Sequence, residues 1–305
     1  MAASVEIVEV SPRDGIQNEE TLLPTAVKAG LIRRAIAGGV CRIEATSFVN
    51  PRRVPQMADA AELMAALRAE HGHGAVRFIG LVLNQRGFER AAEAGVDEVN
   101  CVIVATETFN ARNQGVPVAE TLRQIARIAA DARTAGLGFG VTVGAAFGCP
   151  FEGEVPVARV ETLVRESAAL GPDEISLADT IGVAAPTDVR ARLEVARAVA
   201  PGISLRCHFH NTRNTGLANA VAAVQAGVTA LDASIGGVGG CPFAPAATGN
   251  IPTEDLVYML DRMGVRTGLD LETLIETGDW LAQHLGHEVP SMLGKAGPFP
   301  AAPSG

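Results

Sequence analysis

Short runs of mainly apolar residues recur along the whole chain, and each run is short enough to form one β-strand. The eight runs lie at 5–10, 41–48, 76–83, 97–105, 139–147, 174–179, 203–210 and 229–235. Segments rich in alanine, leucine, arginine and glutamate follow them with the spacing of helices, at 24–37, 54–71, 86–94, 117–135, 157–170, 187–199, 214–227 and 253–263. The pattern therefore predicts eight strands that alternate with eight helices.

Strict alternation of strands and helices favours parallel strands joined by crossover helices. Eight such units are what a closed (β/α)8 TIM barrel requires, whereas an open, doubly wound sheet is the alternative. Against the open sheet, the first strand leads into Ser11-Pro12-Arg13-Asp14-Gly15 instead of a glycine-rich turn for a dinucleotide. We therefore predict a single TIM-barrel domain over 1–305.

The core of this barrel is expected at about 4–265, and a C-terminal helical extension at 266–305. Within the extension, 270–286 has the pattern of one more helix. The tail from Pro290 is rich in glycine and proline, which is typical of either a mobile flap or a frayed end.

The charge balance narrows the range of partners. The chain has 25 Lys and Arg against 34 Asp and Glu, a net charge of −9, and no segment concentrates the basic residues. This argues against nucleic acid and against an anionic membrane as partners. No apolar run approaches the roughly 20 residues of a membrane span, and the N-terminus lacks the pattern of an export signal. We expect a cytoplasmic protein.

Five cysteines are widely spaced, which does not suggest a disulfide framework. Four of them, Cys41, Cys101, Cys149 and Cys207, lie in or beside predicted strands, and we interpret them as small buried hydrophobic residues. The fifth, Cys241, lies in the glycine-rich stretch Gly236-Gly237-Val238-Gly239-Gly240-Cys241-Pro242.

Polar residues follow or end several predicted strands, where a parallel barrel collects its chemistry. They are Arg13 and Asp14 after the first strand, Glu44 in the second, Asp179 in the sixth, His208 and His210 in the seventh, and Cys241 and Asn250 after the eighth. Residues i and i+2 of a strand point to the same face, so His208 and His210 would present two imidazoles side by side. A His-x-His pair taken alone is more often incidental than metal-binding.

Asp14, His208 and His210 offer two nitrogens and a carboxylate, to which Asn250 could add an amide oxygen. Such a mixed set suits Mg²⁺ or Mn²⁺, with Zn²⁺ as a further candidate. The alternatives are a turn-forming Asp14 before Gly15 and a helix-starting turn at Asn250.

Two further residues are candidates for catalysis. Arg13 cannot lose its proton and could hold an oxygen that becomes negative during a reaction, whereas the alternative is an ion pair with Glu44. Cys241 lies in a loop flexible enough to close over a site, so its thiol is a candidate acid or nucleophile, the alternative being an inert loop cysteine.

Several motifs resemble one family along most of the chain. They are Val8-Glu9-Val10-Ser11-Pro12-Arg13-Asp14-Gly15-Ile16-Gln17-Asn18-Glu19, Ile43-Glu44-Ala45-Thr46-Ser47-Phe48-Val49, Phe147-Gly148-Cys149-Pro150-Phe151-Glu152-Gly153, Leu177-Ala178-Asp179-Thr180-Ile181-Gly182-Val183, Gly239-Gly240-Cys241-Pro242-Phe243 and Thr248-Gly249-Asn250. The chain resembles 3-hydroxy-3-methylglutaryl-CoA lyases, which belong to the wider superfamily of metal-dependent aldolase and Claisen-enzyme barrels.

The resemblance implies that Asp14, His208, His210 and Asn250 bind a divalent cation. It also implies that Arg13 stabilises a thioester enolate, that Cys241 handles a proton at the nascent acetyl-CoA carbon, and that Glu44, Asp179 and Glu254 support the site. Whether His208 or Asp14 removes the hydroxyl proton stays open. Arg13, Gln17, Asn211 and Arg213 are expected to contact an acyl-CoA substrate, and a homo-oligomer, a dimer or tetramer, is implied.

Departures from the family pattern lie directly after the histidine pair. Where the family commonly has Asp-Thr-Tyr-Gly, this chain has Asn211-Thr212-Arg213-Asn214, and Glu20 and Phe243 also differ. We therefore expect retro-Claisen cleavage of 3-hydroxy-3-methylglutaryl-CoA, or of a close branched 3-hydroxyacyl-CoA analogue, to acetyl-CoA and acetoacetate or the matching 3-oxo acid. The alternatives are a lyase for a different 3-hydroxyacyl-CoA such as citramalyl-CoA, a Claisen-condensing acyltransferase of the same superfamily, and a metal-dependent binding protein without catalysis.

Overall fold

The computed structural model describes residues 4–240 and 249–299. In this part of the chain, eight parallel strands close into a barrel in the order β1-β10-β9-β8-β5-β4-β3-β2. The strands are β1 (Glu6–Glu9), β2 (Arg42–Ser47), β3 (Arg77–Val82), β4 (Glu98–Val104), β5 (Gly138–Gly144), β8 (Glu174–Asp179), β9 (Ser204–Phe209) and β10 (Ala230–Ala233). The predicted TIM barrel is confirmed, because each strand pairs in parallel with its neighbours and β1 pairs with both β10 and β2.

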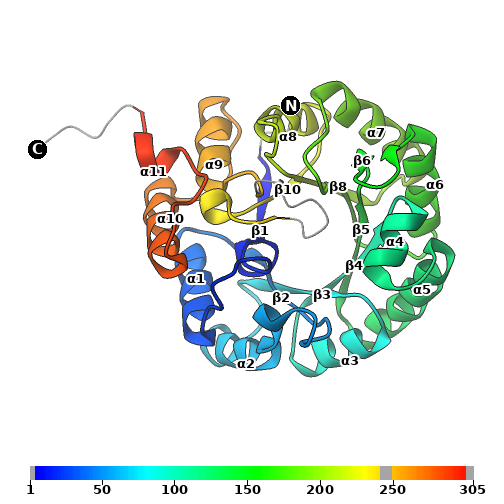
Figure 1. The fold of residues 1–305 in the computed structure, drawn as a ribbon, viewed down its shortest axis with the longest axis horizontal. Helices are drawn as coiled ribbons and strands as arrows, with labels where there is room; N and C mark the ends of the chain where they lie inside the picture. The colour runs from blue at the N-terminus through cyan, green and yellow to red at the C-terminus, as the bar shows by residue number, and fades with distance from the viewer. Residues whose placement is uncertain (1–3, 241–248, 300–305) are drawn as a thin grey trace, which may run out of the picture.

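Helices surround the barrel on its outside, as Figure 1 shows. They are α1 (Thr25–Ala37), α2 (Ala60–His71), α3 (Gln85–Glu93), α4 (Glu107–Gln114), α5 (Val118–Ala135), α6 (Val157–Ala168), α7 (Pro186–Val199), α8 (Gly216–Gln225), α9 (Thr253–Arg262), α10 (Leu271–Leu285) and α11 (Leu293–Ala296). Three short helical turns join them, namely η1 (Ser11–Gly15), η2 (Pro55–Met57) and η3 (Ile235–Gly237). Among the described residues, no helix is long and apolar enough to cross a membrane.

The structure differs from the predicted elements in three places. Helix α4 was not predicted, because it is polar on nearly every face and buries only Phe109 and Asn110. A small antiparallel hairpin, β6 (Gly148–Cys149) with β7 (Gly153–Glu154), follows β5. The single helix predicted over 54–71 is instead divided into η2 and α2.

One prediction about the cysteines was wrong. Cys41 is exposed, since it lies just before β2 and not in the buried part of the strand. Cys101, Cys149 and Cys207 are buried as predicted, and burial raises the pKa of the Cys101 and Cys207 thiols.

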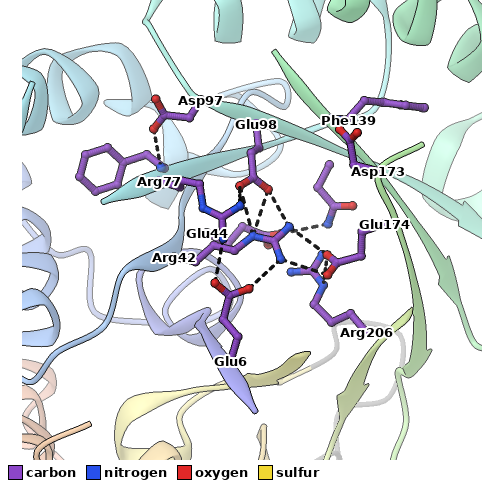
Figure 2. Close-up of polar contacts among 12 residues, drawn as sticks. Glu6, Arg42, Glu44, Arg77, Asp97, Glu98, Phe139, Asp173, Glu174 and Arg206 are labelled. Carbon is purple, nitrogen blue, oxygen red and sulfur yellow. Dashed lines mark hydrogen bonds and ion pairs between the residues drawn. The ribbon is translucent and has the colours of Figure 1, made fainter. Parts of the chain in front are cut away.

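The apolar core lies mainly between the barrel and its helices, whereas the inside of the barrel is largely polar. The separate inner apolar cluster consists of Val8, Val10 and Ile79. Below it, Arg42 donates hydrogen bonds to Glu98 at 2.6 Å and to Glu174 at 2.9 Å (Figure 2). Because a buried charge is costly unless it is paired, these ion pairs allow charged side chains to fill the barrel.

The C-terminal extension is anchored beside the barrel mouth. Asp255, in the first turn of α9, accepts hydrogen bonds from the backbone N–H groups of Met292 and Leu293. The backbone N–H of Ser291 donates to the carbonyl of Gly236 at 3.0 Å, and Ser291 is buried. The segment before α11 is therefore packed against η3, which does not fit a frayed end.

Candidate active site

A cavity of about 660 Å³ opens at the carboxyl ends of the strands. Arg13, Asp14, Gln17, His208 and His210 all line it, although they come from opposite ends of the chain. Parallel pairing of β1 with β10, and of β10 with β9, brings the first and the penultimate barrel strands to the same side of the mouth. The closed barrel thus assembles most of the predicted site.

Helical turn η1 carries Arg13 and Asp14 directly after β1. It fits closely against the segment after β10, because a Cβ atom at Gly15 would lie 2.8 Å from both the Ser234 hydroxyl and a Val238 methyl group. Only glycine allows this approach. The Asp14-Gly15 pair therefore has a packing role as well as a chemical one.

Asp14, His208 and His210 form a cluster that can hold a metal ion, and their ligand atoms lie within 4.8 Å of one another. Nε2 of His208 and Nε2 of His210 each lie 3.7 Å from the same Asp14 oxygen, Oδ2. These separations are too long for hydrogen bonds. The two imidazole nitrogens and the carboxylate oxygen point toward one another without forming hydrogen bonds. Such a group of atoms fits the donor set of a divalent cation.

Asn250 reaches the same point from the segment before α9. A β-bridge joins it to His210, and its Nδ2 donates to Asp14 Oδ2 at 2.9 Å and to the Val238 carbonyl at 3.1 Å. Its Oδ1 is buried and has no hydrogen-bond partner among residues 4–240 and 249–299. If the amide turned over, this oxygen would face Asp14 Oδ2, and only a cation between them would make that arrangement favourable.

Arg13 lies between two carboxylates. Its Nη1 donates to Asp14 at 2.6 Å, and its Nε donates to the buried Glu44, which also accepts a hydrogen bond from Asn100 at 3.0 Å. Burial alone would raise the pKa of Asp14, but Arg13 and the two imidazoles lower it well below its ordinary value. Asp14 is therefore ionised at neutral pH, as a cation ligand must be. The ion pair with Glu44, which was the alternative role for Arg13, is present.

Asp232 is a residue of the candidate site that the sequence reasoning missed. It lies in β10 beside His208 of β9, and its Oδ2 lies 3.0 Å from Nδ1 of His208. It also lines the cavity. A carboxylate in the middle of the apolar run Ala230-Leu231-Asp232-Ala233 was the available signal.

The sequence analysis included Glu9 in a longer motif but assigned it no role of its own. Its buried carboxylate accepts hydrogen bonds from the backbone N–H groups of Ser11 and Ile235 and from the Thr253 hydroxyl. It thereby joins η1, η3 and α9 at the edge of the site. A glutamate in an apolar strand was visible in the sequence, but two of its three partners, Ile235 and Thr253, lie 226 and 244 residues away in the chain.

Asp179 and Glu254 lie close to the site and hold its loops. Asp179 accepts hydrogen bonds from the backbone N–H groups of Val183 and Ala184 after β8, and burial raises its pKa. Glu254 accepts the backbone N–H of Gly236 with both oxygens at 3.1 Å, and burial raises its pKa to about 8. Gly236 has a φ of 74°, a conformation that favours glycine.

Asn211 and Arg213 organise the loops around the mouth. Asn211 Oδ1 accepts the backbone N–H of Gly216, and Arg213 donates to the carbonyls of Ile181 and Gly182. Neither is among the described residues that line the cavity, whereas Gln17 is. Cys241 lies outside the described residues, so its proposed role rests on the sequence alone.

A closed (β/α)8 barrel with an Asp-His-His cluster at the carboxyl end of its strands defines the class of TIM-barrel enzymes that use a bound metal ion. The sequence profile described as HMGL-like matches residues 4–281. The chain therefore belongs to the HMGL-like family, and it is a carbon–carbon lyase like its relatives.

Among those relatives, an (R)-citramalyl-CoA lyase of Chloroflexus aurantiacus is 48% identical over 303 residues, which cover 97% of this chain and 95% of that protein. A hydroxymethylglutaryl-CoA lyase of Bacillus subtilis is 40% identical and covers 94% of this chain and 95% of its own length. The structure of an HMG-CoA lyase from Acinetobacter baumannii in complex with coenzyme A and 3-methylmalate has a TM-score of 0.93 at 40% identity. That match covers 98% of this chain and 97% of the other. These likenesses confirm the predicted family and fold.

Proposed function

We propose that this protein cleaves a branched 3-hydroxyacyl-CoA by a retro-Claisen reaction and releases acetyl-CoA together with an oxo acid. The observation that carries the proposal is the convergence of Asp14, His208 and His210 at the cavity, on the fold of a lyase family. The cavity of about 660 Å³ is large enough for the acyl group and part of the pantetheine arm.

The first candidate substrate is (R)-citramalyl-CoA, because the relative named for it shares more sequence with this chain than the hydroxymethylglutaryl-CoA lyases reported above. In this substrate the carboxylate and the hydroxyl are on the same carbon. Cleavage would convert that carbon into the ketone of pyruvate, and the electrons of the broken bond would pass to the acetyl thioester.

The second candidate is 3-hydroxy-3-methylglutaryl-CoA, which would yield acetoacetate in place of pyruvate. It is supported by the structural likeness to an HMG-CoA lyase bound to coenzyme A and 3-methylmalate. The two substrates differ by one methylene group between the carbinol carbon and the carboxylate, so the reacting groups could use the same residues.

Each reacting group has a candidate partner in this chain. Arg13 remains protonated and lines the cavity, so its guanidinium is suited to hold the thioester oxygen as enolate charge develops. His208 and Asp14 are the two candidates for taking the hydroxyl proton, and His208 could do so only while its Nε2 is not bound to the cation. Cys241 is proposed to deliver a proton to the acetyl carbon once the bond has broken.

A divalent ion, Mg²⁺ or Mn²⁺ with Zn²⁺ as a further candidate, would supply a Lewis acid that polarises the hydroxyl and carboxylate oxygens of the substrate. Asp14, His208 and His210 would hold it, and Asn250 would join them through its Oδ1, which has no partner in the described part of the chain.

The test is a substrate panel with Mn²⁺ present: (R)-citramalyl-CoA, (S)-citramalyl-CoA, 3-hydroxy-3-methylglutaryl-CoA and the unbranched malyl-CoA. Acetyl-CoA is measured together with pyruvate, acetoacetate or glyoxylate. We expect the highest kcat/KM with (R)-citramalyl-CoA. A preference for 3-hydroxy-3-methylglutaryl-CoA would select the second candidate, and no acetyl-CoA from any branched ester would overturn the proposed reaction.

A further inference from the structure

The two histidines of the metal cluster are held in different ways. Nδ1 of His208 lies 3.0 Å from Oδ2 of Asp232, whereas Nδ1 of His210 is buried and has no hydrogen-bond partner among the described residues. Both rings turn Nε2 toward Asp14. In the part of the chain that the structure describes, a side chain therefore fixes the Nδ1 side of His208 but not that of His210.

Asp232 is itself fixed by a second buried group. Its other oxygen, Oδ1, accepts a hydrogen bond from Nη1 of Arg206 at 3.0 Å. Arg206 comes two residues before His208 on β9, so both side chains point to the same face of the strand. Its side chain is almost fully buried and is also paired with Glu174 at 3.0 Å.

The chain of contacts continues to the bottom of the barrel. Glu174 accepts hydrogen bonds from Arg42, which is paired with Glu98 (Figure 2). Paired charges thus extend from the metal cluster through the barrel, and each carboxylate between two arginines has a fixed direction. Asp232 is the member of this series that touches a cluster histidine.

We propose that Asp232 is a positioning residue that keeps His208 in the tautomer and orientation needed to bind a divalent cation, with Arg206 directing the Asp232 carboxylate. A carboxylate only accepts hydrogen bonds, so the proton of neutral His208 is on Nδ1 and the lone pair is on Nε2, the nitrogen that faces Asp14. Carboxylate partners of this kind orient histidine ligands in metal sites, and their loss typically lowers metal affinity about 10–100-fold.

This inference rests on the metal site of the proposed function, and one substitution separates the two. In Asp232→Asn, Arg206 can only donate, so it selects the amide orientation with the oxygen toward Arg206 and the NH2 group toward His208. His208 Nδ1 would then have to accept, and the proton would move to Nε2. The amide therefore favours the wrong tautomer while it preserves the shape of the side chain.

The matched control is Asp97→Asn. Asp97 also joins an arginine and a histidine, at 2.5 Å from Arg68 and 3.1 Å from His73, but it precedes β4 at the opposite end of the barrel. In both variants an amide replaces the carboxylate that bridges an arginine and a histidine. Only the Asp232 bridge includes a residue of the metal cluster.

The experiment titrates each protein with Mn²⁺ alone by calorimetry, without substrate. We expect Asp232→Asn to weaken Mn²⁺ binding about 10–100-fold, and Asp97→Asn to leave it within about twofold of wild type. Circular dichroism shows whether each variant is folded. A folded Asp232→Asn protein that binds Mn²⁺ as tightly as wild type would overturn the proposal, whereas a wild-type protein that binds no Mn²⁺ would overturn the metal site itself.

A second measurement does not depend on any variant being stable. In ¹⁵N-histidine NMR of the metal-free wild-type protein at about pH 9, we expect neutral His208 as the Nδ1–H tautomer. The signal is identified by its loss in His208→Gln. The Nε2–H tautomer in wild type would contradict the role of Asp232 even if Mn²⁺ binds.

Discussion

Glu9 provides a quantitative test of how the fold holds the site. Its carboxylate is fully buried and accepts hydrogen bonds from Ser11 N–H at 2.8 Å, Ile235 N–H at 3.0 Å and the Thr253 hydroxyl at 2.7 Å. Glu9→Ala would leave all three donors without an acceptor. Since each unsatisfied buried donor costs about 1–3 kcal/mol, we expect a loss of about 3–9 kcal/mol in the free energy of unfolding.

The matched variant is Glu9→Gln, which keeps the shape of the side chain. Its amide oxygen can accept both backbone N–H groups, since Oε1 of Glu9 accepts both, and the Thr253 hydroxyl can rotate to accept from the NH2 group. We therefore expect Glu9→Gln to lose less than about 1 kcal/mol. The assay is urea unfolding followed by circular dichroism, with the slope m compared between proteins.

Two outcomes would refute this reasoning. One is a Glu9→Ala protein within about 1 kcal/mol of wild type, and the other is a Glu9→Gln protein as unstable as Glu9→Ala. A third readout links the fold to the site: Glu9→Ala should also weaken Mn²⁺ binding, because η1, which carries Asp14, loses its attachment to η3.

Three further outcomes are expected. Arg13→Lys should lower kcat about 10²–10³-fold with Mn²⁺ affinity nearly unchanged, because a point charge replaces the forked guanidinium that is proposed to hold the enolate oxygen. Equal losses in kcat and in Mn²⁺ affinity would contradict this. Cys241→Ala should lower kcat at least about 10²-fold in the acetyl-CoA assay, and turnover within a few-fold of wild type would exclude Cys241 as the proton donor. Burial raises the pKa of Glu254 from 4.5 to about 8, so the folded protein keeps the proton of this group at pH values where the unfolded chain has lost it. The stability that Glu254 contributes is therefore fully present below about pH 4.5. As the pH rises to about 8, the free energy of unfolding falls by up to about 5 kcal/mol. Glu254→Gln should remove this decline between about pH 5 and pH 8 in urea unfolding, and an unchanged decline would count against it.

The fold could be predicted because hydrophobic periodicity reports strands and helices that bury one face. The eight barrel strands and most helices lie where the apolar runs indicated. Helix α4 could not be found in this way, since it buries little of its surface and shows no apolar stripe. The exposure of Cys41 shows the same limit at strand ends, where a shift of one residue decides burial.

The grouping of Asp14, His208 and His210 could be predicted because these residues carry unusual chemistry at predicted strand ends. Asp14, His208 and His210 do lie together. The residues that support them were harder to find, because their roles depend on partners that are distant in sequence. Asp232 becomes meaningful only when β10 is paired with β9 in the observed register, and Glu9 only when η3 and α9 are in place.

The residues that depart from the family pattern after the histidine pair make identifiable contacts. Asn211 and Arg213 hold backbone groups of the loops around the mouth instead of lining the cavity. Their effect on substrate preference would therefore act through the position of these loops. Sequence comparison with a family pattern could identify the departures but not this indirect role.

The central claim is tested most directly by the release of acetyl-CoA from (R)-citramalyl-CoA before and after removal of divalent cations. The account predicts that the protein treated with a chelator and then desalted produces no acetyl-CoA, and that Mn²⁺ restores equal amounts of acetyl-CoA and pyruvate. Undiminished release from the metal-free protein would contradict the role of Asp14, His208 and His210. The absence of release from this ester and from 3-hydroxy-3-methylglutaryl-CoA with Mn²⁺ bound would contradict the reaction.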